Sequence, residues 1–135
     1  MAKILLTEDD EAVRSFVGRA LEISGHQVIT AEDGEEGYDC LIAHQGQFDL
    51  LLTDIKMPFM DGIELSRTAA AQFPDLKILM MTGFADQKER AGDLEDIVID
   101  VVPKPFTLTQ IRSAVDAAIA GLPPTAEDFA VRIAG

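Results

Sequence analysis

The feature that most constrains this chain is a regular alternation between short apolar runs and longer segments with helical periodicity. Five runs rich in Val, Ile, Leu and Thr predict β-strands: residues 4–7, 27–31, 50–53, 78–82 and 98–102. Three of them are almost continuously apolar, which is typical of strands buried on both faces of a parallel sheet. Helices that join parallel strands by right-handed crossovers cover both faces. We therefore expect an α/β fold of five βα units: a doubly wound, five-stranded parallel sheet inside a three-layer sandwich.

The segments between the apolar runs carry the signals that begin and end helices. The first helix is expected between the N-cap Asp10 and the stop Gly25, with the apolar stripe Val13, Phe16, Val17, Ala20 and Leu21. Three further helices are expected at residues 35–43, 63–73 and 87–94, the last of them highly charged. Residues 107–110 have the form of a capping box, which opens a final helix with the stripe Leu108, Ile111, Val115, Ala118 and Ile119.

Composition favours a single globular domain of the cytoplasm. The 135 residues, of which 47% are hydrophobic, suffice for one core. The formal net charge of −13 disfavours direct binding to nucleic acid and indicates either simple solubility or a surface facing a basic partner or a cation. No apolar run approaches the roughly 20 residues of a membrane span, so no membrane association is expected. The single cysteine, Cys40, excludes an internal disulfide and fits a cytoplasmic protein.

We expect residues 1–121 to form the domain and residues 122–135 to form a C-terminal tail. The sequence Leu122-Pro123-Pro124 ends the last helix because proline cannot continue it. Two interpretations of the tail remain open. It is either a frayed terminus or a short helix capped by Thr125, with Phe129 and Ile133 on one face for docking or partner contact.

Polar side chains stand at the ends of four of the five predicted strands. Glu8 and Asp9 follow the first strand, Asp54 follows the third, Thr82 ends the fourth, and Lys104 follows the fifth. The carboxyl ends of parallel strands share one edge of the sheet, where the functional crevice of such folds lies. Each residue alone has a simpler interpretation, since an acid there is usually a helix N-cap and a Thr reflects strand propensity. Their joint occurrence in this order favours a site.

Clustered carboxylates repel one another, and a hard cation such as Mg²⁺ relieves that repulsion. Mg²⁺ prefers one or two carboxylates, a backbone carbonyl and water. We expect Asp9 and Asp54 to be direct ligands, Glu8 to act through water, and the carbonyl of Lys56 to supply a further protein oxygen.

The same residues suit phosphoryl transfer to a carboxylate. An oxygen of Asp54 would attack phosphorus in line and form an aspartyl phosphate. The ammonium of Lys104 would stabilise the charge of the transferring group, and the hydroxyl of Thr82 would donate a hydrogen bond to one of its oxygens. Pro105 stiffens the backbone before it, and the Lys104–Pro105 bond could be cis.

Four stretches of the chain match a known pattern. They read ILLTEDD at residues 4–10, LLTDIKMPFMDG at 51–62, MTGFA at 81–85 and PKPF at 103–106. Over about residues 2–121 the chain thereby resembles the receiver domain of bacterial response regulators, the CheY-like superfamily. The resemblance implies the flavodoxin-like strand order 2-1-3-4-5 and phosphorylation of Asp54. It also implies Mg²⁺ held by Asp9 and the Lys56 carbonyl with help from Glu8, and Thr82 and Lys104 as contacts of the phosphoryl group. Gly62 would relieve backbone constraint where the next helix opens.

The resemblance also implies partners. The phosphoryl donor would be a phosphohistidine on a histidine kinase or a histidine phosphotransfer protein, and the same site would later hydrolyse the acyl phosphate. Such a domain is not a turnover enzyme but a module whose interaction surface changes, here around the fourth helix and fifth strand. The MTGFAD stretch, the charged fourth helix and the lack of an output domain resemble the CpdR type, which regulates proteolysis by ClpXP. A protease or adaptor would then be the downstream target; a phosphorelay shuttle and a phosphate sink remain open.

One position departs from the usual receiver pattern. Val101 stands where many receivers carry an aromatic residue, and its stiff β-branched side chain cannot swing as a ring does. Phe84 or Phe106 are candidates to replace that ring. The residue pattern disfavours two other functions. A Mg²⁺-dependent phosphohydrolase usually needs an acid two residues after its nucleophile, where this chain has Lys56. A pseudo-receiver without chemistry is disfavoured because all five expected side chains are present.

Overall fold

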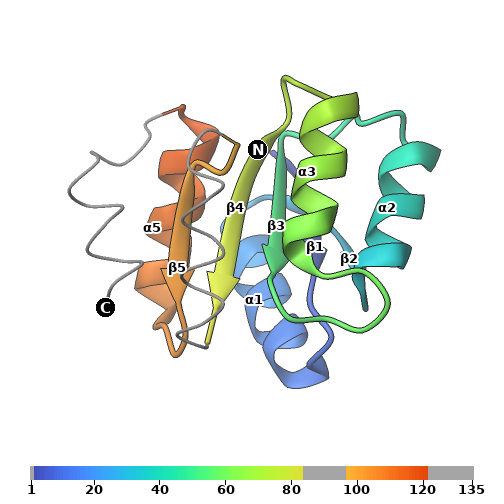
Figure 1. The fold of residues 1–135 in the computed structure, drawn as a ribbon. Helices are drawn as coiled ribbons and strands as arrows, with labels where there is room; N and C mark the ends of the chain where they lie inside the picture. Colours follow the sequence, from blue (N-terminus) through green and yellow to red (C-terminus); the bar gives the residue numbers. More distant parts are fainter. Residues whose placement is uncertain (1, 84–96, 122–135) are drawn as a thin grey trace.

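The computed structural model describes residues 2–83 and 97–121 and contains one parallel sheet. Its strands are β1 (Lys3–Thr7), β2 (Gln27–Ala31), β3 (Leu50–Asp54), β4 (Lys77–Thr82) and β5 (Asp100–Pro103). The described helices are α1 (Glu11–Ile23), α2 (Gly34–Ala43), α3 (Gly62–Gln72) and α5 (Leu108–Ile119). The strand order is β2-β1-β3-β4-β5 and every pairing is parallel, which confirms the predicted doubly wound sheet (Figure 1).

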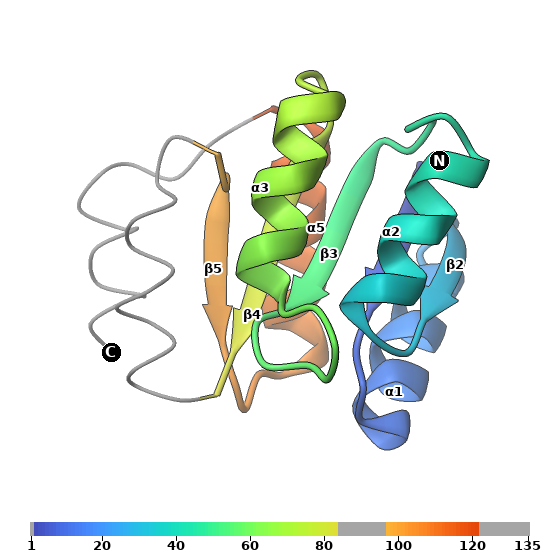
Figure 2. The same cartoon turned by 45° about the vertical axis from the view of Figure 1, so that its right-hand side comes forward.

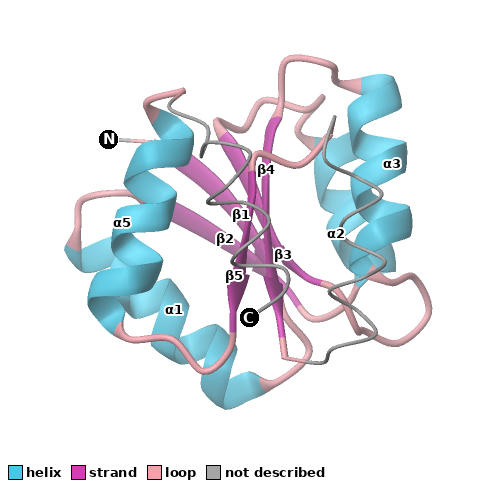
Figure 3. Ribbon diagram, turned by 60° about the vertical axis from the view of Figure 1, so that its left-hand side comes forward, coloured by secondary structure: helices cyan, strands magenta, loops and turns pink. Residues whose placement is uncertain are grey.

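The helices lie in two layers, one on each face of the sheet. Helices α1 and α5 cover one face, while α2 and α3 cover the other (Figure 3). In the view of Figure 2, α2 and α3 lie in front of the sheet and α1 and α5 lie behind it. This is the three-layer sandwich that the alternation of apolar runs predicts.

Alternate residues of the central strands serve two separate cores, which explains their continuous apolar runs. Leu5 and Leu51 face the side of α2 and α3, and they pack with Leu41 and Leu65 of those helices. On the other face, leucine and isoleucine side chains of the same strands pack with α1 and α5; the members include Ile4, Leu6, Leu50, Leu52, Leu21 and Val115. Strands β1, β3 and β4 are therefore buried on both faces, whereas the edge strand β2 is partly exposed.

Side-chain caps fix where the described helices begin. The carboxylate of Asp10 accepts a hydrogen bond from the Val13 backbone N–H, as expected for an N-cap. Asp33 and Asp61 cap α2 and α3 in the same way. The predicted capping box is also present at α5, where Thr107 and Gln110 exchange side-chain and backbone hydrogen bonds.

Three details of the sequence-based prediction are wrong. Strand β5 runs from Asp100 to Pro103 rather than over residues 98–102, because regular pairing with β4 begins at Leu79 opposite Asp100. The predicted apolar stripes also extend too far, since Phe16 and Leu108 are each 44% exposed. Phe16 borders an open groove together with Pro105 and Phe106, and Leu108 is the first residue of α5.

Several expectations fall outside the described residues: the fourth helix at 87–94, the part played by Phe84, and the tail at 122–135. Within the described residues, the helices are all too short or too polar to span a bilayer. The Lys104–Pro105 peptide bond is cis.

Candidate functional site

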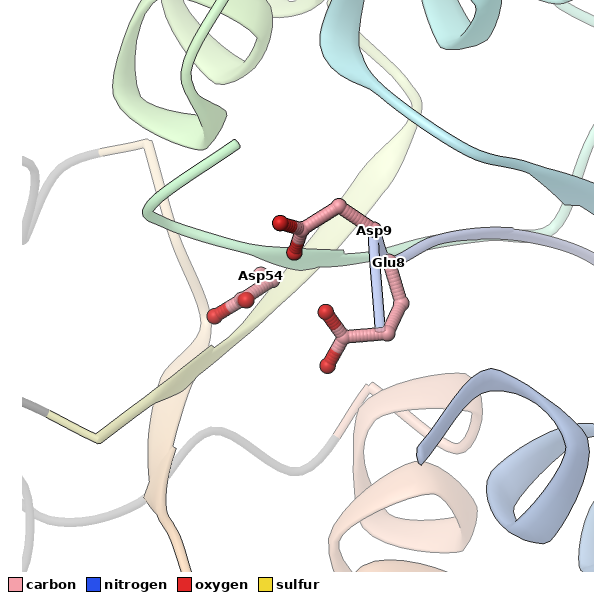
Figure 4. Close-up of side chains that lie close together, drawn as sticks. All are labelled: Glu8, Asp9 and Asp54. Atoms are coloured by element: carbon pink, nitrogen blue, oxygen red, sulfur yellow. The ribbon is translucent and has the colours of Figure 1, made fainter. Parts of the chain in front are cut away.

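The ends of β1 and β3 bring three carboxylates together. Thr7 pairs with Thr53 in the β1–β3 ladder, so the next residues, Glu8 and Asp54, emerge side by side. Glu8, Asp9 and Asp54 each offer a carboxylate oxygen, and these oxygens all lie within 4.8 Å of one another. Figure 4 shows the three side chains gathered at this edge of the sheet. Acids separated by 45 positions in the chain thus share one site, as the sequence predicted.

The carboxylates open into a pocket of about 670 Å³. Its wall is formed by the acids named above together with residues at the start of α1 and after β3, β4 and β5: Asp10, Val13, Lys56, Met57, Pro58, Gly83 and Lys104. The loop after β3 and the end of β5 therefore border the same space. A pocket of this size admits a phosphoryl group and hydrated cation, but a large share of its wall is charged.

Lys104 joins the acids from the end of β5. Its Nζ lies 2.5 Å from Oε1 of Glu8 and 3.2 Å from Oδ2 of Asp54. The backbone N–H of Lys104 donates to the Thr82 carbonyl at 2.7 Å, which continues the β4–β5 pairing to this point. Pairing with β4 therefore fixes the backbone of Lys104, and the ammonium of Lys104 bridges two carboxylates.

Burial changes the protonation of these groups. Glu8 is fully buried, and desolvation raises the pKa of its carboxyl, although the hydrogen bond from Lys104 opposes the change. Burial and the neighbouring Glu8 raise the pKa of Asp9 as well. Desolvation alone would lower the pKa of Lys104, but its hydrogen bond with Glu8 and the charge of Asp54 outweigh it and raise the pKa. Lys104 is therefore held as an ammonium, whereas the carboxyl groups of Glu8 and Asp9 lose their protons less readily than they would in water.

The carboxylate of Asp54 is held in one orientation. Its Oδ1 accepts a hydrogen bond of 2.9 Å from the Ile55 backbone N–H, and its Oδ2 faces Lys104. The residue is only 7% exposed, so a reactant reaches it from the pocket side alone. One oxygen is engaged by the backbone and the other points at the positive charge of the site.

Two further predicted site residues, Thr82 and Lys56, differ in exposure. Thr82 ends β4 and is fully buried, while its neighbour Gly83 lines the pocket. Lys56 is exposed and lies on the pocket wall, two residues after Asp54. Both stand at the predicted edge of the sheet.

Gly62 has a different role from the one the sequence suggested. Its φ lies outside the left-handed region, so it does not relieve backbone constraint. A Cβ at this position would meet the Asp54 carbonyl oxygen at 1.9 Å. Glycine is required because the start of α3 closes directly onto the end of β3.

Two contacts that hold Glu8 were not among the sequence-based predictions. Arg14, one turn into α1, donates from its guanidinium to the Glu8 carbonyl at 2.9 Å. The Asp10 backbone N–H donates to Oε2 of Glu8 at 3.3 Å. A signal for Arg14 exists in its spacing from the N-cap Asp10, since residues four apart share a helix face.

The donor set fits a hard divalent cation. One oxygen from each of three carboxylates lies within 4.8 Å of the other two, and oxygen ligands of this kind suit Mg²⁺. The raised pKa values of Glu8 and Asp9 show that the acids are crowded and desolvated before any cation arrives. A bound cation would relieve that crowding.

Comparisons with known proteins agree with this geometry. A family model described as the response regulator receiver domain matches residues 4–116. The response regulator receiver protein CpdR of Brucella abortus is 41% identical over 116 residues, covering 86% of this chain and 95% of CpdR. The response regulator MprA of Mycobacterium bovis is 34% identical over 132 residues, and the alignment spans 56% of MprA.

Solved structures show the same architecture. A response regulator receiver domain protein from Clostridium thermocellum superposes with a TM-score of 0.82 at 26% identity, covering 90% of this chain and 96% of that one. The response regulator TrrA of Thermotoga maritima, solved with Mg²⁺ and BeF, gives a TM-score of 0.78 at 26% identity, covering 87% of this chain and 99% of TrrA.

Proposed function

The chain belongs to the response regulator receiver domain family of two-component systems, and on that premise we propose that Asp54 accepts a phosphoryl group from a phosphohistidine. The observation that carries the proposal is the setting of the Asp54 carboxylate. It lies at the floor of an acidic pocket, fixed at Oδ1 by a backbone N–H and facing the Lys104 ammonium at Oδ2. A structural acid at the end of a strand would not need a half-buried lysine and two further carboxylates beside it.

Each side chain then has a part in the transfer. A carboxylate oxygen of Asp54 forms the bond to phosphorus as the bond from phosphorus to the donor imidazole nitrogen breaks, and the leaving imidazole takes a proton from solvent. The Lys104 ammonium stabilises charge that spreads over the phosphoryl oxygens. The Thr82 hydroxyl donates a hydrogen bond to one of those oxygens in the phosphorylated state.

Glu8, Asp9 and Asp54, with the backbone carbonyl of Lys56, would hold Mg²⁺. When bound, the ion supplies positive charge against the phosphoryl oxygens and the attacking carboxylate. Before phosphorylation Lys104 already neutralises part of the acidic cluster, because it bridges Glu8 and Asp54. Cation and lysine would therefore both place positive charge beside the Asp54 carboxylate and orient it.

The proposed partners follow from this chemistry. A histidine kinase or histidine phosphotransfer protein of the cytoplasm supplies the phosphoryl group, and residues 1–121 form the receiver unit. The domain catalyses phosphorylation and dephosphorylation of its own Asp54 and is a switch rather than a turnover enzyme. Similarity to CpdR over 95% of that protein's length supports a comparable output, namely a protein target such as a protease or its adaptor. The tail at 122–135 is the segment we propose to test for that contact.

The test is binding of beryllofluoride, a mimic of the phosphoryl group, followed by NMR. We expect binding that requires Mg²⁺, is lost in Asp54→Ala, and shifts signals around Thr82. Asp75→Asn is the matched control, because this exposed acid precedes β4 at the opposite edge of the sheet. Binding without Mg²⁺, or unchanged binding in Asp54→Ala, would contradict the proposal. Repeated turnover of small phosphate esters would point instead to a phosphohydrolase.

A further inference from the structure

Two buried threonine hydroxyls form a chain beneath the carboxylate of Asp54. Thr7 and Thr53 stand opposite each other on β1 and β3, and both are fully buried. The Thr7 hydroxyl donates a hydrogen bond to the Thr53 hydroxyl. The Thr53 hydroxyl in turn donates to the backbone carbonyl of Asp54 at 2.9 Å. Each donor in the chain therefore has one acceptor, and the chain ends on the backbone of the predicted phosphoacceptor.

The peptide bond between Asp54 and Ile55 connects this chain to the reactive carboxylate. Its carbonyl accepts the hydrogen bond from Thr53, and its N–H donates to Oδ1 of Asp54. A peptide unit is planar, so fixing the direction of its carbonyl also fixes the direction of its N–H. The two hydroxyls thereby set the orientation of the carboxylate without touching it.

The surroundings keep the hydroxyls in place. Gly37 of α2 approaches so closely that a Cβ there would lie 2.5 Å from Cγ2 of Thr7. Gly62 closes on the Asp54 carbonyl from the other side, as described above. A buried hydroxyl that loses its partner has no water to replace it, and a β-branched side chain has few rotamers in which to find another. The packing of α2 and α3 therefore stabilises one hydrogen-bond arrangement.

We propose that Thr7 and Thr53 are positioning residues for phosphorylation of Asp54. They hold the 54–55 peptide so that Oδ1 stays on the Ile55 N–H and Oδ2, the oxygen facing Lys104, makes the bond to phosphorus. This inference rests on the proposed function, since it concerns the same reaction. It concerns the rate of transfer and the aim of the Asp54 carboxylate, and it leaves the other two acids of the cluster, Glu8 and Asp9, unchanged.

The experiment measures phosphorylation of the full chain by acetyl phosphate, a donor without a protein surface. Thr53→Val keeps the shape of the side chain and removes the hydroxyl, whereas Thr53→Ser keeps the hydroxyl. Thr7→Val removes the first hydroxyl of the hydrogen-bond series and leaves that of Thr53 in place. Ser66→Ala is the matched control, because Ser66 is a fully buried hydroxyl on α3 without a hydrogen-bond partner among the described residues. Each variant is followed for its maximal rate constant, its half-saturating acetyl phosphate concentration and its Kd for Mg²⁺.

We expect Thr53→Val to lower the maximal rate constant about tenfold, because small misplacement of a reacting group costs up to about 100-fold in rate. Half-saturation and Mg²⁺ affinity should stay within about twofold, and Thr53→Ser should restore the rate. Thr7→Val should give a smaller loss of about threefold, and adding it to Thr53→Val should cause no further loss, because both act through one chain. Ser66→Ala should react like the wild type.

A wild-type rate in Thr53→Val would overturn the inference. So would a loss that Thr53→Ser does not repair, since it indicates a general effect on the fold. A loss of rate matched by an equal loss of Mg²⁺ affinity would also overturn it, since the rate would then follow the metal site rather than the aim of the nucleophile. If Thr53→Val does not fold, Thr7→Val decides on the same criteria. Failure of the proposed function looks different: the wild type itself would neither react with acetyl phosphate nor bind beryllofluoride.

Discussion

The two edges of the sheet differ in how their charged side chains are paired. At the amino edge, polar side chains complete the backbone: Asp49 accepts from the Lys3 N–H at 2.8 Å, and the Lys77 ammonium donates to the Ile119 carbonyl at the end of α5, also at 2.8 Å. At the carboxyl edge, charged side chains also pair with one another, as in the contacts of Lys104 with Glu8 and Asp54. The first arrangement is complete in itself. At the carboxyl edge, the cluster of Glu8, Asp9 and Asp54 is bridged by the ammonium of Lys104. Three negative charges facing this one positive charge favour a ligand that carries positive charge.

The largest contrast between the edges should appear when one acid of each is neutralised. Asp54→Asn should reduce phosphorylation by acetyl phosphate at least 100-fold, because the amide removes the nucleophilic oxygen. Asp49→Asn should leave the rate unchanged and lower the free energy of unfolding by about 1 kcal/mol, since it weakens one hydrogen bond to the backbone. Phosphate incorporation and urea unfolding measure the two effects. Equal losses of phosphorylation in both variants would remove the distinction.

A second comparison replaces one lysine at each edge by methionine, which keeps the length and removes the charge. Lys104→Met should lower the rate of phosphorylation about 100-fold, because a preorganised cation at the developing charge is lost. It should also strengthen Mg²⁺ binding, since a competing positive charge disappears from the acids. Lys77→Met should affect only stability, by about 1 kcal/mol. Calorimetric titration with Mg²⁺ checks the second effect, and weaker Mg²⁺ binding in Lys104→Met would contradict it.

The carboxyl edge should also make cation binding depend on pH. The pKa values of Glu8 and Asp9 are raised above their ordinary 4.5 and 3.8, mainly by burial. The folded, metal-free chain therefore retains protons that the unfolded chain releases, so this contribution to stability is present at low pH and is lost as the pH rises through the raised values. Binding of Mg²⁺ requires the ionised forms, so its affinity should fall and its proton release should grow as the pH is lowered toward those values. Calorimetry in two buffers of different ionisation enthalpy measures the proton release, and a release of zero throughout would contradict the prediction.

The last comparison pairs two residues whose backbone has the same left-handed φ, and its Phe59→Gly variant has the smallest expected effect of all. Gly46, near the amino edge, has φ 69°, and a Cβ there would meet the Phe73 ring at 2.2 Å. Phe59, in the loop bordering the pocket, also has φ 69° and is 83% exposed. Phe59→Gly should therefore raise the free energy of unfolding by about 0.5 kcal/mol, because relief of the left-handed strain exceeds the added chain entropy only slightly. Gly46→Ala should lower it by about 2 kcal/mol.

Urea unfolding of the two variants measures both changes. A loss of stability in Phe59→Gly would mean that the exposed ring makes a stabilising contact. The comparison then also tells whether the loop after β3 carries backbone strain at the edge where the reaction is proposed, as functional loops commonly do.

Most of the fold could be predicted because its signals are local. The runs at β2 and β3, the N-cap Asp10 and the capping box at Thr107 are confirmed within one residue. Errors arose where burial depends on distant elements. The apolar residues Val98 and Ile99 suggested an earlier start for β5, but its register is set by pairing with β4. Phe16 and Leu108 fit the helical period, yet no described element covers them fully.

The sequence by itself determined the order of strands and helices, the helix caps and the set of polar residues that reach the carboxyl edge. These depend on periodicity, backbone preference and the direction of parallel strands, all of which are written along the chain. Only the tertiary structure decided that Glu8 is buried against Lys104, that Gly62 must lack a side chain, and that Thr7 and Thr53 link to Asp54. Such features depend on the register between strands and on which helix covers them, so charges and hydroxyls acquire their environment only when distant segments meet.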